Sequence, residues 1–197
     1  MIKNKDISFV LQGIVNPSTN IVIKSIRDHF PESTIILSSW SNSEIGILDY
    51  DILVTSDDPG GMIVDDKVLL YNNINRQIKS SFEGIKRVTT KYVIKVRTDI
   101  IFNSNKILKY LNEYSNTGGK YNLVQSRILV LSDTSNNPHR DYKMPYHICD
   151  FIYAGLTQDI YEVFNIDFMP DEYFRWFETR IMPDNANYQT MLSRYMP

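Results

Sequence analysis

Short apolar runs and helical stripes alternate along the first half of this chain. Four runs have the length and composition of buried β-strands: 6–11, 33–37, 50–54 and 91–96. Apolar side chains recur about four positions apart over 20–30 and 72–88, which is the pattern of a helix with one buried face. Strands that alternate with helices are typical of an α/β protein, so we predict a mostly parallel central sheet flanked by helices.

The second half has a weaker pattern. We predict a helix over 103–114, a β-rich segment over 123–131 and a polar loop over 133–146. The tail from Gln158 onward has a mostly helical pattern that is broken at Pro170 and Pro183. No repeat or linker divides the chain, so we predict a single domain over 1–197.

Composition and charge exclude several classes of protein. The 197 residues are 43% hydrophobic, which is enough for a core, and the formal net charge of −2 predicts no nucleic-acid partner. The single cysteine, Cys149, rules out an internal disulfide and suits a reducing compartment. No apolar stretch approaches the roughly 18–20 residues of a membrane span. These features predict a cytoplasmic protein that is soluble or peripheral to a membrane.

Polar residues follow the predicted strands at their carboxyl ends, where parallel sheets bind ligands. Gln12 and Gly13 follow the first strand, Trp40 ends the second, and Asp57 and Asp58 follow the third. Strand ends also need turn-forming residues, so position alone leaves a binding role and a turn role both open.

The strand over 91–96 carries three charges on one face. Lys95, Arg97 and Asp99 alternate along it and therefore point the same way. Charges on a central strand need partners, because unpaired buried charges are costly. One interpretation is mutual ion pairing. The other is that Asp99 binds a divalent cation while Arg97 or Lys95 faces a phosphate.

Two further places carry candidate chemistry. Asn75 and Arg76 lie in the first turn of the helix predicted over 72–88, where backbone N–H groups attract anions, although asparagines there also serve as caps. Asp150 precedes the apolar run 151–155, which suits a general base or a turn residue. P-loop and α/β-hydrolase motifs are absent, and no residue set has zinc-site spacing.

Six segments taken in order resemble the WavE-type family of lipopolysaccharide synthesis. They are Ile-Ser-Phe-Val-Leu-Gln-Gly at 7–13, Ile-Ile-Leu-Ser-Ser-Trp at 35–40, Asp-Asp-Pro-Gly-Gly at 57–61, Asn-Asn-Ile-Asn-Arg-Gln at 72–77, Lys-Val-Arg-Thr-Asp at 95–99 and Asp-Phe-Ile-Tyr-Ala-Gly-Leu at 150–156. The family is similar to GT-A glycosyltransferases. The resemblance therefore implies a Rossmann-like domain that binds a nucleotide-sugar.

The resemblance also implies roles for individual residues. Gln12, Gly13 and Trp40 would border the nucleotide, and Asp57 or Asp58 would lie near its base or ribose. Asn75, Arg76 and Arg97 would reach the diphosphate or donor sugar, Asp99 would bind Mn²⁺ or Mg²⁺, and Asp150 would deprotonate the acceptor.

This sequence departs from the family pattern in two ways. Arg97 replaces the first acid of the Asp-x-Asp motif, and the chain stops earlier than its relatives, which indicates truncation at the C-terminus.

The implied function is transfer of a sugar from a nucleotide-sugar donor to a lipopolysaccharide or other surface-glycan acceptor. Such an enzyme would be hexosyltransferase-like, cytoplasmic and peripheral on the inner membrane, where lipid-linked glycan acceptors lie. Two alternatives remain at this point. One is a truncated or degenerate non-catalytic domain that binds glycans or nucleotides. The other is a sugar-nucleotide nucleotidyltransferase, which would normally show a glycine-rich signature with Arg and Lys after the first strand.

Overall fold

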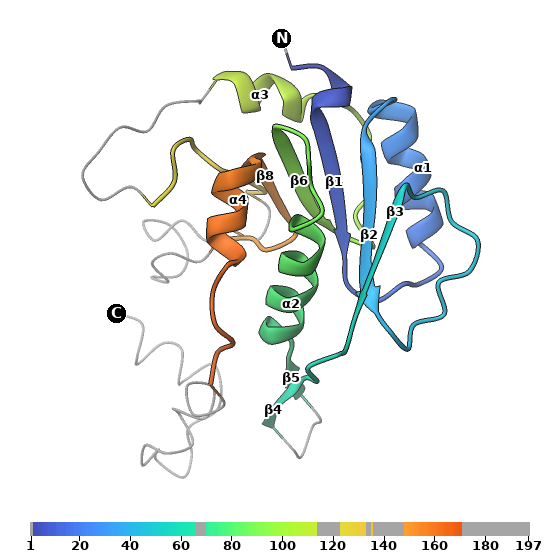
Figure 1. The fold of residues 1–197 in the computed structure, drawn as a ribbon, viewed down its shortest axis with the longest axis vertical. Coiled ribbons are helices and arrows are strands. Elements are labelled where there is room, and N and C mark those ends of the chain that lie inside the picture. The colour runs from blue at the N-terminus through green and yellow to red at the C-terminus, as the bar shows by residue number, and fades with distance from the viewer. Residues whose placement is uncertain (1, 66–69, 114–122, 133–134, 136–147, 171–197) are drawn as a thin grey trace.

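The protein has an α/β fold built on a central six-stranded sheet (Figure 1). The computed structural model describes residues 2–65, 70–113, 123–132, 135 and 148–170. The strand order is β3 (Ile52–Ser56), β2 (Thr34–Trp40), β1 (Ile7–Gln12), β6 (Tyr92–Arg97), β8 (Ile152–Leu156) and β7 (Leu129–Val130). The first four strands in this order are parallel neighbours, whereas β8 runs antiparallel to β6 and to β7. The predicted fold class is confirmed.

Helices cover both faces of the sheet. α1 (Thr19–His29) and α3 (Ile107–Glu113) pack on one face, and α2 (Ile74–Ile85) and α4 (Thr157–Phe164) pack on the other (Figure 1). Along β1, the side chain of Phe9 enters the first of these cores and that of Val10 enters the second, and both are fully buried. Burial on both faces explains why the central strands are apolar almost throughout instead of alternating.

Several boundaries differ from the sequence prediction. The helix predicted over 103–114 begins only at Ile107, because Asn and Ser in the preceding residues favour turns. The segment 123–131 forms a strand only at Leu129–Val130, and the apolar run 151–155 belongs to β8, which was not predicted as a strand. A short 3-10 turn, η1 (Asn4–Asp6), precedes β1.

The predicted helical tail is wrong for residues 165–170. α4 ends at Phe164, and the next six residues have no regular structure. Residues 171–197, which carry Pro183, lie outside the described residues, as does most of the polar loop predicted over 133–146. The single domain over 1–197 therefore stays a prediction.

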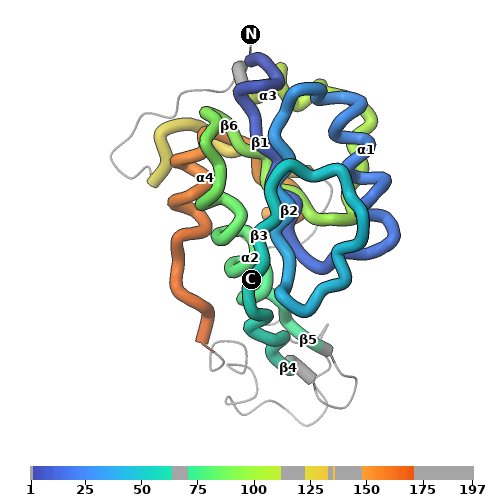
Figure 2. Tube along the Cα trace, turned by 45° about the vertical axis from the view of Figure 1, so that its right-hand side comes forward, coloured from blue at the N-terminus to red at the C-terminus, as the bar shows by residue number. Residues whose placement is uncertain are grey.

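A small hairpin leaves the sheet at the carboxyl ends of β1, β2 and β3. It consists of β4 (Met62–Asp65) and β5 (Leu70–Asn72), which pair antiparallel (Figure 2). This hairpin was not predicted from the sequence. It leads directly into the N-terminus of α2, so this helix begins beside the sheet edge where ligands bind in such folds.

None of the helices within the described ranges is long and apolar enough to cross a membrane.

Candidate functional site

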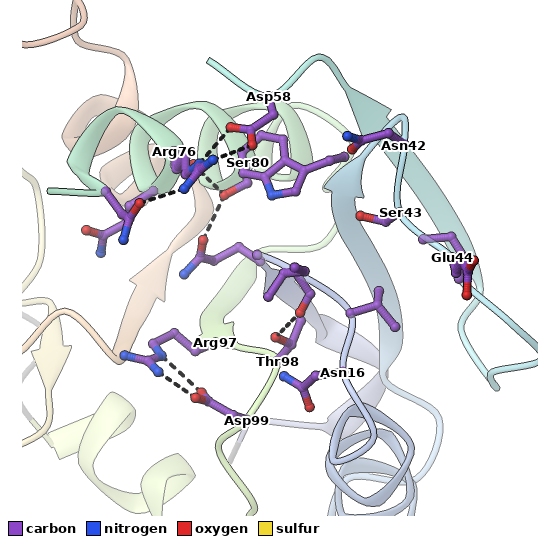
Figure 3. A pocket seen from close by; sticks show the side chains of 18 of the residues that line it. Asn16, Asn42, Ser43, Glu44, Asp58, Arg76, Ser80, Arg97, Thr98 and Asp99 are labelled. Atoms are coloured by element: carbon purple, nitrogen blue, oxygen red, sulfur yellow. Dashed lines mark hydrogen bonds and ion pairs between the residues drawn. The ribbon is translucent and has the colours of Figure 1, made fainter. Parts of the chain in front are cut away.

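A cavity of about 1440 Å³ opens at the carboxyl ends of β1, β2 and β6 (Figure 3). Its size exceeds the roughly 300–1,000 Å³ of typical small-molecule sites, so it has room for an extended ligand. The predicted site residues that line it are Gln12, Gly13, Trp40, Asp58, Arg76, Arg97, Asp99 and Asp150. The structure thus brings together residues from six separate places in the sequence.

The end of β1 forms a rigid part of the cavity wall. Gly13 has a φ of +117°, which only glycine adopts readily, and its N–H donates to the carbonyl of Ser38 over 3.1 Å. The Oε1 of Gln12 accepts a hydrogen bond from the hydroxyl of Ser80 over 2.7 Å, which ties the strand end to α2. The amide nitrogen of Gln12 can donate a hydrogen bond to a ligand in the cavity.

Arg76 forms a bidentate ion pair with Asp58. Its Nε and Nη2 lie 2.8 and 2.7 Å from the two carboxylate oxygens, and its Nη1 donates to Asn73 over 2.9 Å. The hydrogen bond from Arg76 lowers the pKa of Asp58, and the same contact raises the pKa of Arg76. Asp58 and Asn73 thus hold the guanidinium in a fixed direction at the cavity wall, and arginine is a side chain suited to contact phosphate groups.

Arg97 forms a second pair, with Asp99, at a separate place on the cavity wall (Figure 3). The Nε of Arg97 donates to one oxygen of Asp99 over 3.0 Å, and its Nη2 donates to the other oxygen. The centroid of the Phe151 ring lies 4.6 Å from the Cζ of Arg97. The hydrogen bond to Asp99 raises the pKa of Arg97. The structure therefore shows mutual pairing for these two residues.

Lys95 does not join that pair. It is fully buried, and its Nζ donates to the backbone carbonyl of Asp150 over 2.6 Å. Burial lowers the pKa of Lys95 to about 7. The three charges predicted on one face of this strand thus have two different kinds of partner.

The donor set around Asp99 does not fit a divalent cation. Both carboxylate oxygens already accept hydrogen bonds from Arg97, and a cation bound there would lie against a guanidinium of the same charge. In the described part of the chain, no three acidic, histidine or cysteine side chains gather in a group able to hold a metal ion. The metal role of Asp99 stays a prediction.

Two predicted site residues lie away from the cavity wall. Asp57 is exposed and does not line the cavity, whereas its neighbour Asp58 does. Asn75 is 9% exposed, and its side-chain amide donates to the carbonyl and accepts from the N–H of Met169 over 3.0 and 2.8 Å. Asn75 therefore anchors the segment after α4, and its role in donor binding stays a prediction.

Other residues that line the cavity were not predicted from the sequence. The loop after β2 contributes 42–48, and Asn16 and Thr98 lie close to the strand ends (Figure 3). Thr98 is buried and donates to the carbonyl of Ile14 over 2.7 Å, which joins the β1 and β6 loops. Their position in the sequence could have indicated them, because they lie in the loops after strands whose carboxyl ends were predicted to bind a ligand.

A second cavity, of about 470 Å³, adjoins the first. The two share Ile74, Gln77, Ile148 and Asp150, and the second is otherwise lined mostly by apolar side chains such as Phe164. Asp150 consequently lies at the junction of the two cavities.

The sequence and the fold resemble those of several known proteins. The WavE lipopolysaccharide synthesis family matches residues 7–193. A human protein, N-acetyllactosaminide beta-1,3-N-acetylglucosaminyltransferase 2 (Homo sapiens), is 36% identical over 69 residues, which are 34% of this chain and only 16% of that relative. A solved structure, 4-diphosphocytidyl-2C-methyl-D-erythritol synthase from Anaerococcus prevotii, is 14% identical with a TM-score of 0.44 over 90% of this chain and 86% of the other. Because the family match spans nearly the whole sequence, this chain belongs to the WavE lipopolysaccharide synthesis family.

Proposed function

We propose that the protein is a glycosyltransferase that moves a sugar, of hexose type, from a nucleotide-sugar to a lipopolysaccharide or other surface-glycan acceptor. The observation that carries the proposal is that two ion-paired arginines, Arg76 and Arg97, line the same large cavity as Asp150. Family membership and the name of the human relative also support a transferase.

The proposed reaction uses this chain's own side chains. Gln12, Gly13 and Trp40 border the nucleotide. The acceptor hydroxyl oxygen attacks the anomeric carbon of the donor sugar, and the bond from that carbon to the diphosphate oxygen breaks. Asp150 takes the hydroxyl proton, and the nucleoside diphosphate leaves with the bonding electrons. Arg76 and Arg97 stabilise the negative charge that develops on this leaving group.

The two aspartates are proposed to orient the arginines in the absence of donor. Asp58 and Asp99 each hold a guanidinium in a fixed direction, so less side-chain freedom is lost when a diphosphate binds. In this proposal the two arginines neutralise the phosphates without a divalent cation.

The experiment that tests the proposal is calorimetric titration of the protein with UDP, GDP and CMP, each with and without manganese. Micromolar binding of one nucleotide without manganese supports the arginine-based site and assigns the donor class. Binding that requires manganese restores the metal role to Asp99. Failure of all three nucleotides to bind contradicts the transferase proposal and favours a non-catalytic domain.

Replacing either arginine should weaken nucleotide binding. We expect Arg76→Met and Arg97→Met each to lower the affinity by about 10- to 100-fold, because a hydrogen bond to a charged group contributes about 1.5–3 kcal/mol. Each change also leaves Asp58 or Asp99 as an unpaired negative charge beside the phosphates. Titration calorimetry measures the effect.

The matched control is Arg27→Met. Arg27 is likewise paired with carboxylates, those of Asp49 and Asp51, but it does not line the cavity. Equal losses in all three variants would show that the effect is general destabilisation rather than lost phosphate contact.

The acceptor is proposed to approach through the second cavity, because Asp150 must contact the acceptor hydroxyl while the donor occupies the first cavity. Its mostly apolar lining suits a lipid-linked glycan better than a free sugar. Cytoplasmic location and peripheral association with the inner membrane remain parts of the same proposal. Co-sedimentation with vesicles that carry a lipid-linked glycan tests them.

A further inference from the structure

Lys95 has an unusual position for a charged residue. It lies near the end of the central strand β6, is fully buried, and faces the side of the sheet that α2 and α4 cover. Its Nζ lies 5.4 and 5.5 Å from the ring centroids of Tyr153 and Phe164. These aromatic faces attract a cation, but they do not neutralise it as a carboxylate does.

Among the described residues, Lys95 forms no ion pair. A buried ammonium without a paired carboxylate is costly, and an apolar side chain of similar volume would pack there at less cost. Stability alone therefore does not explain a lysine at this position.

The partner of the Lys95 ammonium is the backbone of Asp150. The Nζ–O distance is 2.6 Å, and the side-chain amide of Gln77 donates to the same carbonyl over 3.3 Å. One carbonyl thus accepts hydrogen bonds from both the central strand and α2. The next peptide is also held, because the carbonyl of Phe151 accepts from the N–H of Arg97 over 3.2 Å.

We infer that Lys95 is a positioning residue that fixes the Asp150 backbone, and with it the Asp150 carboxylate, at the junction of the two cavities. The expected effect of Lys95 on catalysis rests on the proposed sugar transfer. The hydrogen bond between Lys95 and the Asp150 carbonyl does not depend on that proposal. A hydrogen bond from an ammonium is roughly twice as strong as one from a neutral donor, so the protonated lysine holds this peptide best.

The test is Lys95→Met, which keeps an unbranched apolar side chain as far as Cε and removes the ammonium donor. We expect kcat for sugar transfer to fall by about 10²-fold, since misplacing a reacting group by about 1 Å has an effect of this size. The KM for the donor should change by less than about threefold, because the arginines remain in place. The matched control, Ile94→Met, alters the opposite face of the same strand and should leave both constants near wild type.

The pH profile distinguishes positioning from simple packing. The groups that act on the Lys95 charge are Asp150 and Cys149 before β8, Arg97 on β6 and Tyr153 on β8, while α2 and α4 bring the uncharged Gln77 and Phe164. In the wild type, kcat should decline as pH rises above about 7, where Lys95 loses its proton. Lys95→Met should show no such decline, and an identical decline in both proteins would contradict the inference.

Stability gives a second pH signature. The pKa of Lys95 is about 7 in the folded protein against an ordinary 10.5, so the unfolded chain holds the proton more tightly between these values. Stability of the wild type should therefore rise with pH across this window. Lys95→Met lacks this rise, so its Tm should exceed that of wild type below about pH 7, and the difference should shrink as pH increases.

Hydrogen–deuterium exchange separates this inference from the proposed function. Amides of 150–152 should exchange several-fold faster in Lys95→Met than in wild type, while Ile94→Met leaves them unchanged. Unchanged exchange of these amides in Lys95→Met would contradict the inference that Lys95 fixes the Asp150 backbone, whether or not the protein is a transferase. Absence of any turnover by the wild type would instead overturn the proposed function.

Discussion

Replacing Asp150 with asparagine should lower the rate of sugar transfer by about 10²- to 10⁴-fold, the usual contribution of a positioned general base. The amide has nearly the same shape, but it cannot take a proton from the acceptor hydroxyl. The backbone carbonyl of Asp150 keeps its contacts with Lys95 and Gln77, so the local structure should persist. Steady-state kinetics of transfer, with nucleotide affinity measured alongside, give the result.

Asp28→Asn is the matched control for this change. Asp28 is an exposed residue on α1 and does not line either cavity. Nucleotide affinity should be similar in wild type and both variants. Transfer by Asp150→Asn at the wild-type rate would remove Asp150 from the mechanism, and the base would then have to be sought elsewhere on the cavity wall.

Gly84→Ala should destabilise the fold by about 1–3 kcal/mol, the typical cost of overpacking a core. Gly84 lies where α2 crosses β1 and β2. An added Cβ would stand 2.4 Å from the Cγ1 of Val10 and 3.0 Å from the Cβ of Ser38. Neither neighbour has room to retreat, because both are fully buried on central strands. For a chain of this size, each kcal/mol lowers Tm by about 2–4 °C, which thermal unfolding detects.

Gly155→Ala provides the comparison. A Cβ there would lie 3.5 Å from side-chain atoms of Ile128 and Ile160, which is ordinary contact. Its Tm should stay close to that of wild type. Equal stability of Gly84→Ala and wild type would mean that α2 lies farther from the sheet than described, and the position of Arg76 at the cavity would need revision.

Strands and helices near the N-terminus were predictable because their signal is local. The run 33–37 and the stripe over 72–88 reflect burial of residues that are neighbours in sequence, and the structure places β2 and α2 there. The β4–β5 hairpin and the end of α4 were not predictable in this way. The segment after α4 is held by Asn75, which is 94 residues away from Met169, and no periodicity records such a contact.

The candidate site also combines residues that were predictable from the sequence with others that were not. Strand ends led to Gln12, Trp40 and Arg97, since the ligand-binding edge of a parallel sheet follows from topology. Asp57 and Asp58 were equivalent in sequence, and only the path of the loop after β3 separated them, by placing Asp58 against Arg76.

The sequence by itself determined the α/β class, the family and the cavity edge at which the polar residues gather, because these depend on local periodicity and on motifs read in order. Only the tertiary structure decided which charges meet. Arg76 pairs with Asp58, Arg97 with Asp99, and Lys95 with the Asp150 backbone 55 residues away. Such pairings depend on strand order and loop paths. Those are set by burial of the whole core, and the identity of a charged residue does not reveal them.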